Sequence, residues 1–311
     1  MAARTMAPPA TAAVRTGRRR GSGVRKAEPR IALAMLSPAL AVILLVALLP
    51  VLYSIYLSLR TATIADSGDW AGLGNYLDVL ADPEFHTAFT NTAVFTVVSV
   101  ALEFGLGLAM ALALHRMLRL RGVMRAAMLI PWAFPVAISA MLWRLMLQDQ
   151  IGIVARIVHG IGLSDQPILS DHTSLMVAAI GVDVWKTTPF VTLLLLAGLQ
   201  TVPRELIEAA TVDGATAVQR FFAVTLPHLK PVVLVALLFR TLESWSVYDL
   251  FWVMTDRQLT SLSTYVFKGV KVSQLQFANG NAAAVLIFAS SIIIALLYLR
   301  IFRTRDARTG G

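Results

Sequence analysis

The chain contains no cysteine and has few charged residues for its length. Charged residues make up 14% of its 311 residues, whereas soluble domains contain about 25%. The missing cysteines exclude a disulfide framework, a thiolate metal site and a cysteine nucleophile. No glycine-rich loop ends in Lys-Ser or Lys-Thr, which excludes ATP hydrolysis by a P-loop. The five histidines lack the spacing of metal ligands, so we predict neither a catalytic site nor a metal site.

Apolar residues make up 57% of the chain and are gathered in six long runs. The mean hydropathy is +0.70. Each run reaches the roughly 20 residues that an α-helix needs to cross the hydrocarbon of a bilayer. The first run is too long for the apolar part of a signal peptide, so we expect it to remain uncleaved. The sequence therefore predicts an all-α polytopic membrane protein with six transmembrane helices, at about residues 31–59, 90–114, 124–146, 175–199, 231–254 and 281–301.

The basic residues are distributed unevenly between the segments that connect these runs. Of the 27 Lys and Arg residues, 19 lie in four segments that six crossings would place on one side of the membrane. Eight lie in residues 1–30, four in 115–125, three in the 200–230 loop and four after residue 299. Cytoplasmic loops are enriched in Lys and Arg, so we expect both termini and the 200–230 loop to be cytoplasmic. The isoelectric point of about 10.3 therefore indicates topology, and we predict no nucleic-acid partner.

The two ends of the chain differ from the transmembrane domain that we expect over residues 31–303. Residues 1–30 are basic and contain little that could form a core, which predicts a disordered cytoplasmic arm. Such an arm is suited to bind the anionic lipid of the cytoplasmic leaflet. Residues 304–311 are expected to form a short cytoplasmic tail.

The 200–230 loop has the pattern of two short helices with a break between them. Pro203 suits the first turn of a helix, and Gly214 can adopt the positive φ that ends one. Thr216 and Gln219 have the spacing of a capping box, which predicts the start of the second helix. We expect Pro227 and Pro231 to end that helix and to return the chain to the membrane.

This loop resembles the cytoplasmic coupling loop of binding-protein-dependent ABC importer permeases. A lone Glu-Ala-Ala is common in helices, but the spacing and the membrane context disfavour an ordinary amphipathic connector. The resemblance implies the fold of a type I ABC importer permease and a loop that contacts ATPase subunits. The residues that carry it, with Val in place of the commoner Ile, are Glu208, Ala209, Ala210, Asp213, Gly214, Val224, Leu226 and Pro227.

Other segments resemble the sugar-permease branch of that family. The segment 72–76 reads Gly-Leu-Gly-Asn-Tyr and precedes the second apolar run, as it does in this branch. The segments 184–190, 212–215 and 236–242 resemble those of actinobacterial trehalose permeases, which implies trehalose or a similar disaccharide as the substrate. One departure is residues 255–260, where the family has a Gly-Gly-Pro type of turn and this chain reads Thr-Asp-Arg-Gln-Leu-Thr.

Two apolar runs carry polar residues, although a charge at the bilayer centre costs about 3 kcal/mol unless it faces water or a partner. In each run four residues follow the spacing i, i+3, i+4, i+7, which places them on one helical face. We predict that these stripes line one pathway for the substrate. The first stripe consists of Asp183, Lys186, Thr187 and Phe190; the second consists of Arg240, Glu243, Ser244 and Val247, with Trp245, Tyr248 and Asp249 close by.

Two interpretations of the stripes remain open. As a pathway, they would offer hydrogen-bonding groups to a sugar and the rings of Phe190 and Trp245 as platforms, and Pro189 would interrupt the fourth helix beside the cavity. As a structural staple, they would form ion pairs, of Lys186 with Asp183 or Glu243 and of Arg240 with Glu243. The pathway is favoured for the stripes as wholes. Two weaker candidates are Glu103, as a lone polar contact, and Arg144, which could extend to the outer interface.

The resemblance implies a permease subunit of an ATP-driven sugar importer in the bacterial plasma membrane, working by alternating access. It implies a second homologous permease, two ATPase subunits that bind ATP and magnesium, and an extracytoplasmic sugar-binding lipoprotein as partners. The chain itself would bind no cofactor and would not be an enzyme. The alternatives are another solute, such as glycerol-3-phosphate, an oligosaccharide or a polyamine, and an ion-coupled secondary transporter that uses Asp183, Glu243 or Asp249.

Overall fold

The structure is a computed structural model that describes residues 28–116, 121–162, 166–272 and 276–306. Nearly all of these residues are helical, which confirms the predicted all-α class. In the described ranges the only strand-like pairing is an isolated antiparallel bridge between Arg60 and Trp70. The predicted basic arm lies outside the described residues up to residue 27, and the predicted tail lies outside them from residue 307.

The chain divides into two compact units, residues 1–52 and residues 53–311. The first unit contains α1, Glu28–Val42, the π-helical segment η2, Ile43–Leu48, and the start of α2, Leu49–Ser58. Every side chain from residue 34 to residue 50 is exposed. A helix that is apolar on all sides requires an apolar environment, and residues Ala34–Ser58 are long enough to cross a bilayer.

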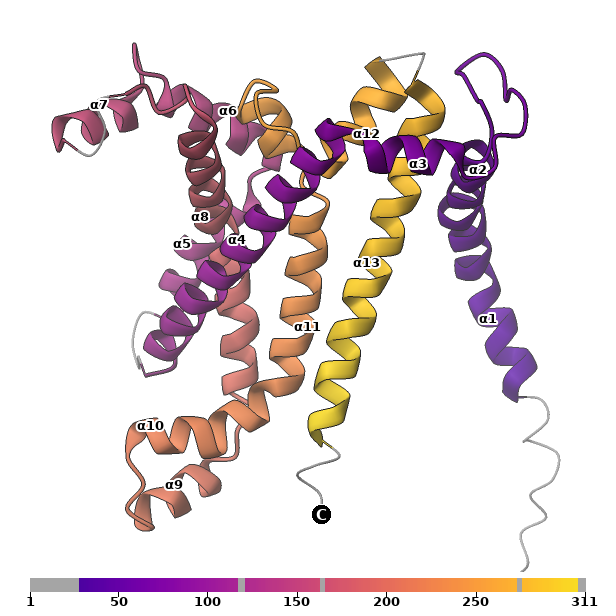
Figure 1. Cartoon of the computed structure of the whole chain (residues 1–311). Helices are drawn as coiled ribbons and strands as arrows, with labels where there is room; N and C mark the ends of the chain where they lie inside the picture. The colour runs from indigo at the N-terminus through magenta and orange to yellow at the C-terminus, as the bar shows by residue number, and fades with distance from the viewer. Residues whose placement is uncertain (1–27, 117–120, 163–165, 273–275, 307–311) are drawn as a thin grey trace, which may run out of the picture. The chain divides into compact units, whose positions relative to one another are not determined.

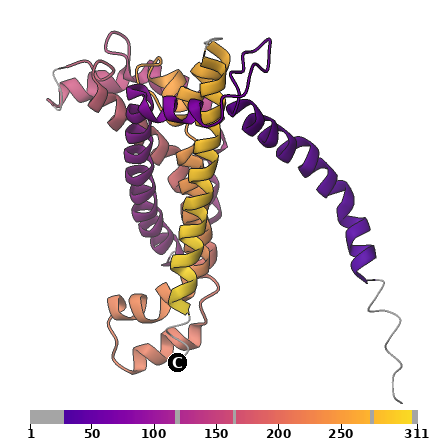
Figure 2. The same cartoon turned by 45° about the vertical axis from the view of Figure 1, so that its right-hand side comes forward.

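The second unit contains four further helices that are long and apolar enough to span a membrane. The helix that begins at Ala217 contains α10, Ala217–Arg220, the π-helical turn η3, Phe221–Thr225, and α11, Leu226–Trp245. Its α11 part packs against α4, α8 and α13, and these helices run along one another in Figures 1 and 2. The four are α4 (Pro83–Arg116), α8 (His172–Leu199), the helix Ala217–Trp245 and α13 (Phe277–Asp306). The part of α13 that can span a membrane runs from Phe277 to Phe302.

The third predicted span, 124–146, is broken in the structure rather than continuous. It consists of α5, Arg121–Ala133, and α6, Val136–Leu147, which meet at an angle of 88°. Pro135 explains the break, since it lacks an N–H and disfavours the helical conformation of Phe134 before it. The described residues therefore hold five long spanning helices, or six spans if the bent pair counts as one.

The fifth predicted span, 231–254, is wrong at both ends. One helix runs without interruption from Ala217 to Trp245, so Pro227 and Pro231 do not end it. The π-helical turn η3 ends at Thr225, two residues before Pro227, and such a turn accommodates a local change of hydrogen bonding. The helix ends nine residues earlier than predicted, and another π-helical segment, η4, Leu250–Met254, follows the break. Pro189 likewise lies inside the continuous helix α8 and does not interrupt it.

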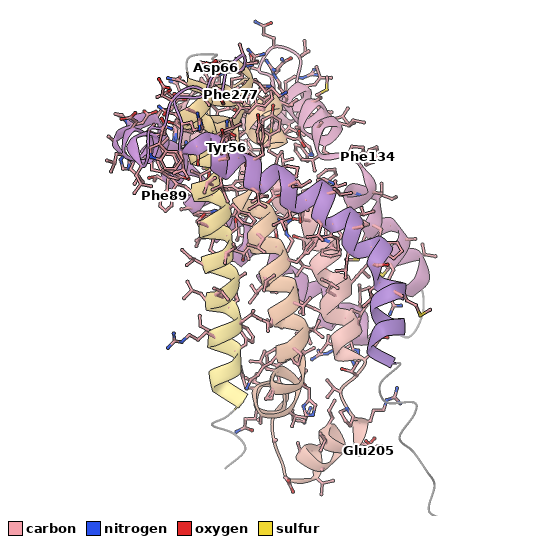
Figure 3. All side chains as sticks on the ribbon, turned by 90° about the vertical axis from the view of Figure 1, so that its right-hand side faces the viewer. Tyr56, Asp66, Phe89, Phe134, Glu205 and Phe277 are labelled. Carbon is pink, nitrogen blue, oxygen red and sulfur yellow. The ribbon has the colours of Figure 1, made fainter. Side chains whose placement is uncertain are left out.

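Short helices occupy the two ends of the second unit. α9, Arg204–Val212, and α10 lie at one end, and α3, Gly74–Ala81, α7, Ile153–Gly160, and α12, Leu262–Phe267, lie at the other (Figure 1). Figure 3 shows Glu205 of α9 at the end of the bundle opposite Asp66 and Phe277. The 200–230 loop and the 60–82 loop are therefore on opposite sides of a membrane that the long helices cross.

Two polar side chains fix helix ends on the α3 side of the bundle. Nδ2 of Asn75 donates to the carbonyl oxygens of Ser58 and Arg60, both at 2.8 Å. It thereby satisfies main-chain groups at the end of α2. At the start of α8, Asp171 accepts hydrogen bonds from the N–H groups of Thr173 and Ser174 and from the Ser174 hydroxyl. These hydrogen bonds hold the pKa of Asp171 below its usual value, and the bond from the Ser174 hydroxyl has the largest effect.

We expect that Gly198→Ala lowers the stability of the helix pair α8 and α11. A Cβ at residue 198 would lie 2.8 Å from Cδ2 of Leu229 and 3.1 Å from Cγ2 of Val232. Overpacking of this kind costs about 1–3 kcal/mol. The matched control is Gly181→Ala in the same helix, where a Cβ meets no atom within 4 Å. Thermal unfolding in detergent measures both variants, and equal midpoints would contradict the close approach.

Candidate functional site

Arg240 lies at the centre of a buried ion-pair network that joins three helices. Its Nε and Nη2 donate to Oε2 and Oε1 of Glu103 on α4, both at 2.7 Å. Nη2 also lies 3.1 Å from Oδ2 of Asp183 on α8. Nη1 donates to Oε2 of Glu243 at 2.6 Å. Since Arg240 is only 1% exposed, the network ties α4, α8 and α11 together away from water.

Glu103 is the member of this network for which the sequence predicted no partner. Its carboxylate is fully buried, forms two hydrogen bonds with Arg240 and accepts a third from Oγ1 of Thr187 at 2.7 Å. Of the ion pairs considered from the sequence, Arg240 with Glu243 is present. Among the described residues Lys186 forms no direct ion pair with Asp183 or Glu243. Glu103 is the one charged residue of the predicted span 90–114, so its need for a partner could be recognised from the sequence, but the identity of that partner could not.

A cavity of about 180 Å³ opens beside the network. Five residues of the two stripes line it: Asp183, Arg240, Glu243, Ser244 and Val247. The break after α11 contributes Ser246–Leu250, and Phe95 and Val136 complete the lining. The side chain of Glu243 is 50% exposed, whereas those of Arg240 and Glu103 are enclosed. Because each nitrogen of Arg240 already has a carboxylate partner, Glu243 is the charged group of the network that is most available to a bound molecule.

Lys186 points away from this cavity lining and caps the broken third span. Its Nζ donates to the carbonyl oxygens of Trp132 at 3.1 Å and Phe134 at 2.6 Å. These carbonyls lie at the end of α5, where the helix stops and its last oxygens lack main-chain partners. The residue is 5% exposed. Lys186 therefore holds the break between α5 and α6, which places Val136 at the cavity.

The two predicted aromatic platforms lie on different sides of the bundle. The ring of Phe190 stacks on that of Trp132, with centroids 5.4 Å apart and planes at 7°. Its other neighbour is Phe239, at 5.7 Å. Trp245 instead faces α13, where its Nε1 donates to Ser290 Oγ at 2.9 Å. Trp245 is thus outside the cavity lining, although it follows Ser244 in the sequence.

The loop between α8 and α11 owes its shape to specific main-chain hydrogen bonds. Gly214 has φ +79°, its N–H donates to Thr211 O, and the N–H of Ala215 donates to Ala210 O. This pair of bonds is the Schellman arrangement that ends a helix with a left-handed residue. Thr216 and Gln219 then form the predicted capping box at the start of α10. The spacing between Ala210 and Gly214 in the motif is thus the spacing that these two hydrogen bonds require at the end of α9.

The residues of the predicted coupling loop are largely exposed. Residues 208, 209, 213, 214 and 227 are exposed, and α9 has no buried residue. Val212, Val218 and Phe222 are 88%, 66% and 62% exposed. A groove of about 520 Å³ runs beside Val218 and Phe222, between the C-terminal end of α4 at Leu112 and α10. Large apolar side chains are therefore exposed together at this end of the second unit.

Comparison with known proteins identifies the family and the fold. Residues 104–308 match the family described as "Binding-protein-dependent transport system inner membrane component". The chain is 40% identical over 289 residues to the trehalose/maltose transport system permease protein MalF of Thermococcus litoralis, covering 91% of this chain and 97% of that one. It is 38% identical over 289 residues to the trehalose transport system permease protein SugA of Mycobacterium tuberculosis, covering 90% and 91%.

The solved structures agree with the architecture described above. A bacterial alginate ABC transporter in complex with an alginate pentasaccharide-bound periplasmic protein contains a chain that superposes with a TM-score of 0.76. The identity is 22%, and the superposition covers 91% of this chain and 98% of that one. At this identity the match supports the fold alone.

We expect that Arg240→Met destabilises the protein strongly, whereas Glu243→Gln does not. The first change leaves the carboxylates of Glu103 and Asp183 buried without their cation, which costs about 3–5 kcal/mol. Glu243 is half exposed, and the loss of such a pair costs about 1 kcal/mol or less. Thermal unfolding of both variants in the same detergent measures the difference. Similar midpoints for the two variants would show that the network does not hold the helices together.

Proposed function

Because the chain belongs to the binding-protein-dependent transport system inner membrane components, we propose that it forms one half of the translocation pathway of an ATP-driven sugar importer. We propose trehalose or a similar disaccharide as the substrate. The similarity to permeases named for trehalose and maltose, over about nine tenths of each chain, supports this class of substrate.

The observation that carries the proposal is the cavity beside Arg240, open on the side of Glu243. A neutral sugar is bound through many hydroxyl groups, which require charged or polar partners that are fixed in place. Glu243 is anchored through one oxygen to Arg240, and its side chain remains half exposed. Ser246, Tyr248 and Asp249 add polar groups to the same wall. Arg240 has the role of a positioning residue, because its nitrogens are occupied by Glu103, Asp183 and Glu243.

Trp132 and Phe190 supply an aromatic surface on the neighbouring helices α5 and α8. Trp132 is 45% exposed, so the stacked pair presents a ring face to its surroundings. The apolar face of a pyranose packs well on such a ring. Lys186 holds the main chain of this region through the carbonyl of Trp132. Lys186 therefore acts through Trp132 and Phe134 rather than by touching sugar.

ATP hydrolysis belongs to separate ATPase subunits in this proposal, since the sequence has no P-loop. The exposed α9–α10 loop is the surface that we assign to them, with Glu208, Ala209 and Asp213 on its outside. The helix Ala217–Trp245 leads without interruption from this loop to Arg240 and Glu243. A displacement of the loop would therefore move this helix, and with it the wall of the cavity that carries Arg240 and Glu243.

The remaining partners and the orientation follow from the same proposal. The cavity is not enclosed by this chain at Glu243, whose side chain is half exposed, and a second homologous permease would close it there. A sugar-binding protein would deliver substrate at the end that carries α3, α7 and α12. We assign both termini and the α9–α10 loop to the cytoplasm, and the enrichment of Lys and Arg in those segments supports this assignment.

The test is uptake of labelled trehalose into proteoliposomes that contain the full transporter. We expect uptake to require ATP. We expect Glu243→Gln to lower the apparent affinity for trehalose about ten- to hundred-fold, since losing a hydrogen bond to a charged group costs about 1.5–3 kcal/mol. Glu84→Gln is the matched control: Glu84 is 47% exposed and bonded to Lys268 at 2.6 Å, away from the cavity. Uptake that is driven by an ion gradient without ATP would contradict the proposal.

We also expect Gly214→Val to separate ATP hydrolysis from transport while the protein stays folded. A β-branched residue at φ +79° is strained by about 1–2 kcal/mol, which distorts the break between α9 and α10. The control is Gly162→Val, which has a similar φ of +71° and open surroundings but lies at the other end of the bundle. The measurement compares ATPase activity and uptake in the same proteoliposomes. Normal coupling in both variants would remove the loop from the mechanism.

A further inference from the structure

The short helix α7 carries an apolar face that no described residue covers. Ile153, Ile157 and the following Ile161 are 58%, 57% and 67% exposed. Residues at intervals of four lie on the same face of a helix. Three large aliphatic side chains in a row are unusual on a surface that faces water.

The opposite face of α7 attaches it to the rest of the second unit. Ala155 is fully buried, and Val154 packs against the core cluster that includes Leu147 and Leu175. Nε2 of His159 lies 3.2 Å from the carbonyl oxygen of Gln166. These contacts fix the rotation of the helix, so its isoleucine face points outward.

The position of α7 connects this face to the lipid-facing surface. In Figures 1 and 2, α7 lies at the end opposite α9 and runs across the direction of the long helices. It follows α6, which belongs to the broken third span. Four apolar residues of α6 are 47–62% exposed, as expected for a helix in contact with acyl chains: Ile138, Met141, Leu142 and Leu145.

The only charged residue on the exposed side of α7 is also suited to lipid. Arg156 lies between Ile153 and Ile157 in the sequence and is exposed. A long basic side chain beside an apolar face can extend its guanidinium to lipid phosphates while its stem stays in the interface. No aspartate or glutamate occurs in residues 153–162, so nothing there opposes an anionic surface.

We propose that α7 is an interfacial helix that lies in the outer boundary of the bilayer. Its isoleucines contact the acyl chains, and Arg156 contacts the phosphate layer. The helix thereby anchors the outer end of the bent span next to the cavity. A protein-docking surface is disfavoured, because such surfaces combine apolar residues with aromatic and hydrogen-bonding groups, and this face offers isoleucine and one arginine.

The absence of native cysteine in this chain allows a direct test by spin labelling. The full-length chain, with its partner subunits in cysteine-free form, is placed in nanodiscs of phosphatidylethanolamine and phosphatidylglycerol. A nitroxide at Ile157→Cys should collide with oxygen several-fold more than with a water-soluble nickel chelate. Met141→Cys on α6 is the lipid reference, and Asp66→Cys, at an exposed position before α3, is the aqueous reference.

The outcomes separate lipid from the other occupants. The ratio of oxygen to nickel collisions is measured at Ile153→Cys and Ile161→Cys as well as at Ile157→Cys. Ratios at all three positions near that of Met141→Cys would support the interfacial helix. A ratio near that of Asp66→Cys would show an aqueous face and overturn the proposal. Protection from both reagents, present from the start or appearing only when the binding protein is added, would also overturn it, because the face would then contact protein.

Discussion

The bidentate pairing of Arg240 with Glu103 is the interaction on which the middle of this protein depends. A guanidinium inside the membrane requires partners, and here they come from α4, α8 and its own helix α11. The network fixes the depth of the three helices relative to one another, in addition to the apolar packing between them at residues such as Ala111, Val191 and Leu229. The same network leaves the half-exposed Glu243 facing the cavity, so one set of charges serves both cohesion and the pathway that we propose.

A continuous helix connects the α9–α10 loop, which we assign to the ATPase subunits, with the cavity that we assign to the sugar. The α9–α10 loop is shaped by a helix end at Gly214 and a capping box at Thr216, which define its geometry through main-chain bonds. From there a single helix leads to Arg240 and Glu243. The break after Trp245 and the break at Pro135 both border the cavity, through Ser246 and Val136. The cavity is therefore built where helices end, and its walls can change when the long helix moves.

Much of the fold could be predicted from the sequence, because apolar runs and basic loops report directly on spans. The glycine at 214 and the capping box at 216 were also predictable, since each depends on local backbone chemistry. The corrections concern prolines: Pro135 breaks a span, whereas Pro189, Pro227 and Pro231 are accommodated in continuous helices by their surroundings. The partner of Arg240 could not be predicted, because Glu103 is 137 residues away and only helix packing brings it near. The same limit applies to Lys186, whose partners are main-chain oxygens, and to Trp245, which faces α13.

Arg240 and Glu103 stabilise the helix bundle through each other. A double-mutant cycle with Arg240→Met, Glu103→Gln and the combined variant measures this coupling by the free energy of unfolding in detergent. We expect strong coupling, with the combined variant more stable than Arg240→Met alone, because neutralising Glu103 removes a buried carboxylate that has lost its cation. Simple addition of the two single effects would show that the two side chains do not stabilise the bundle through each other.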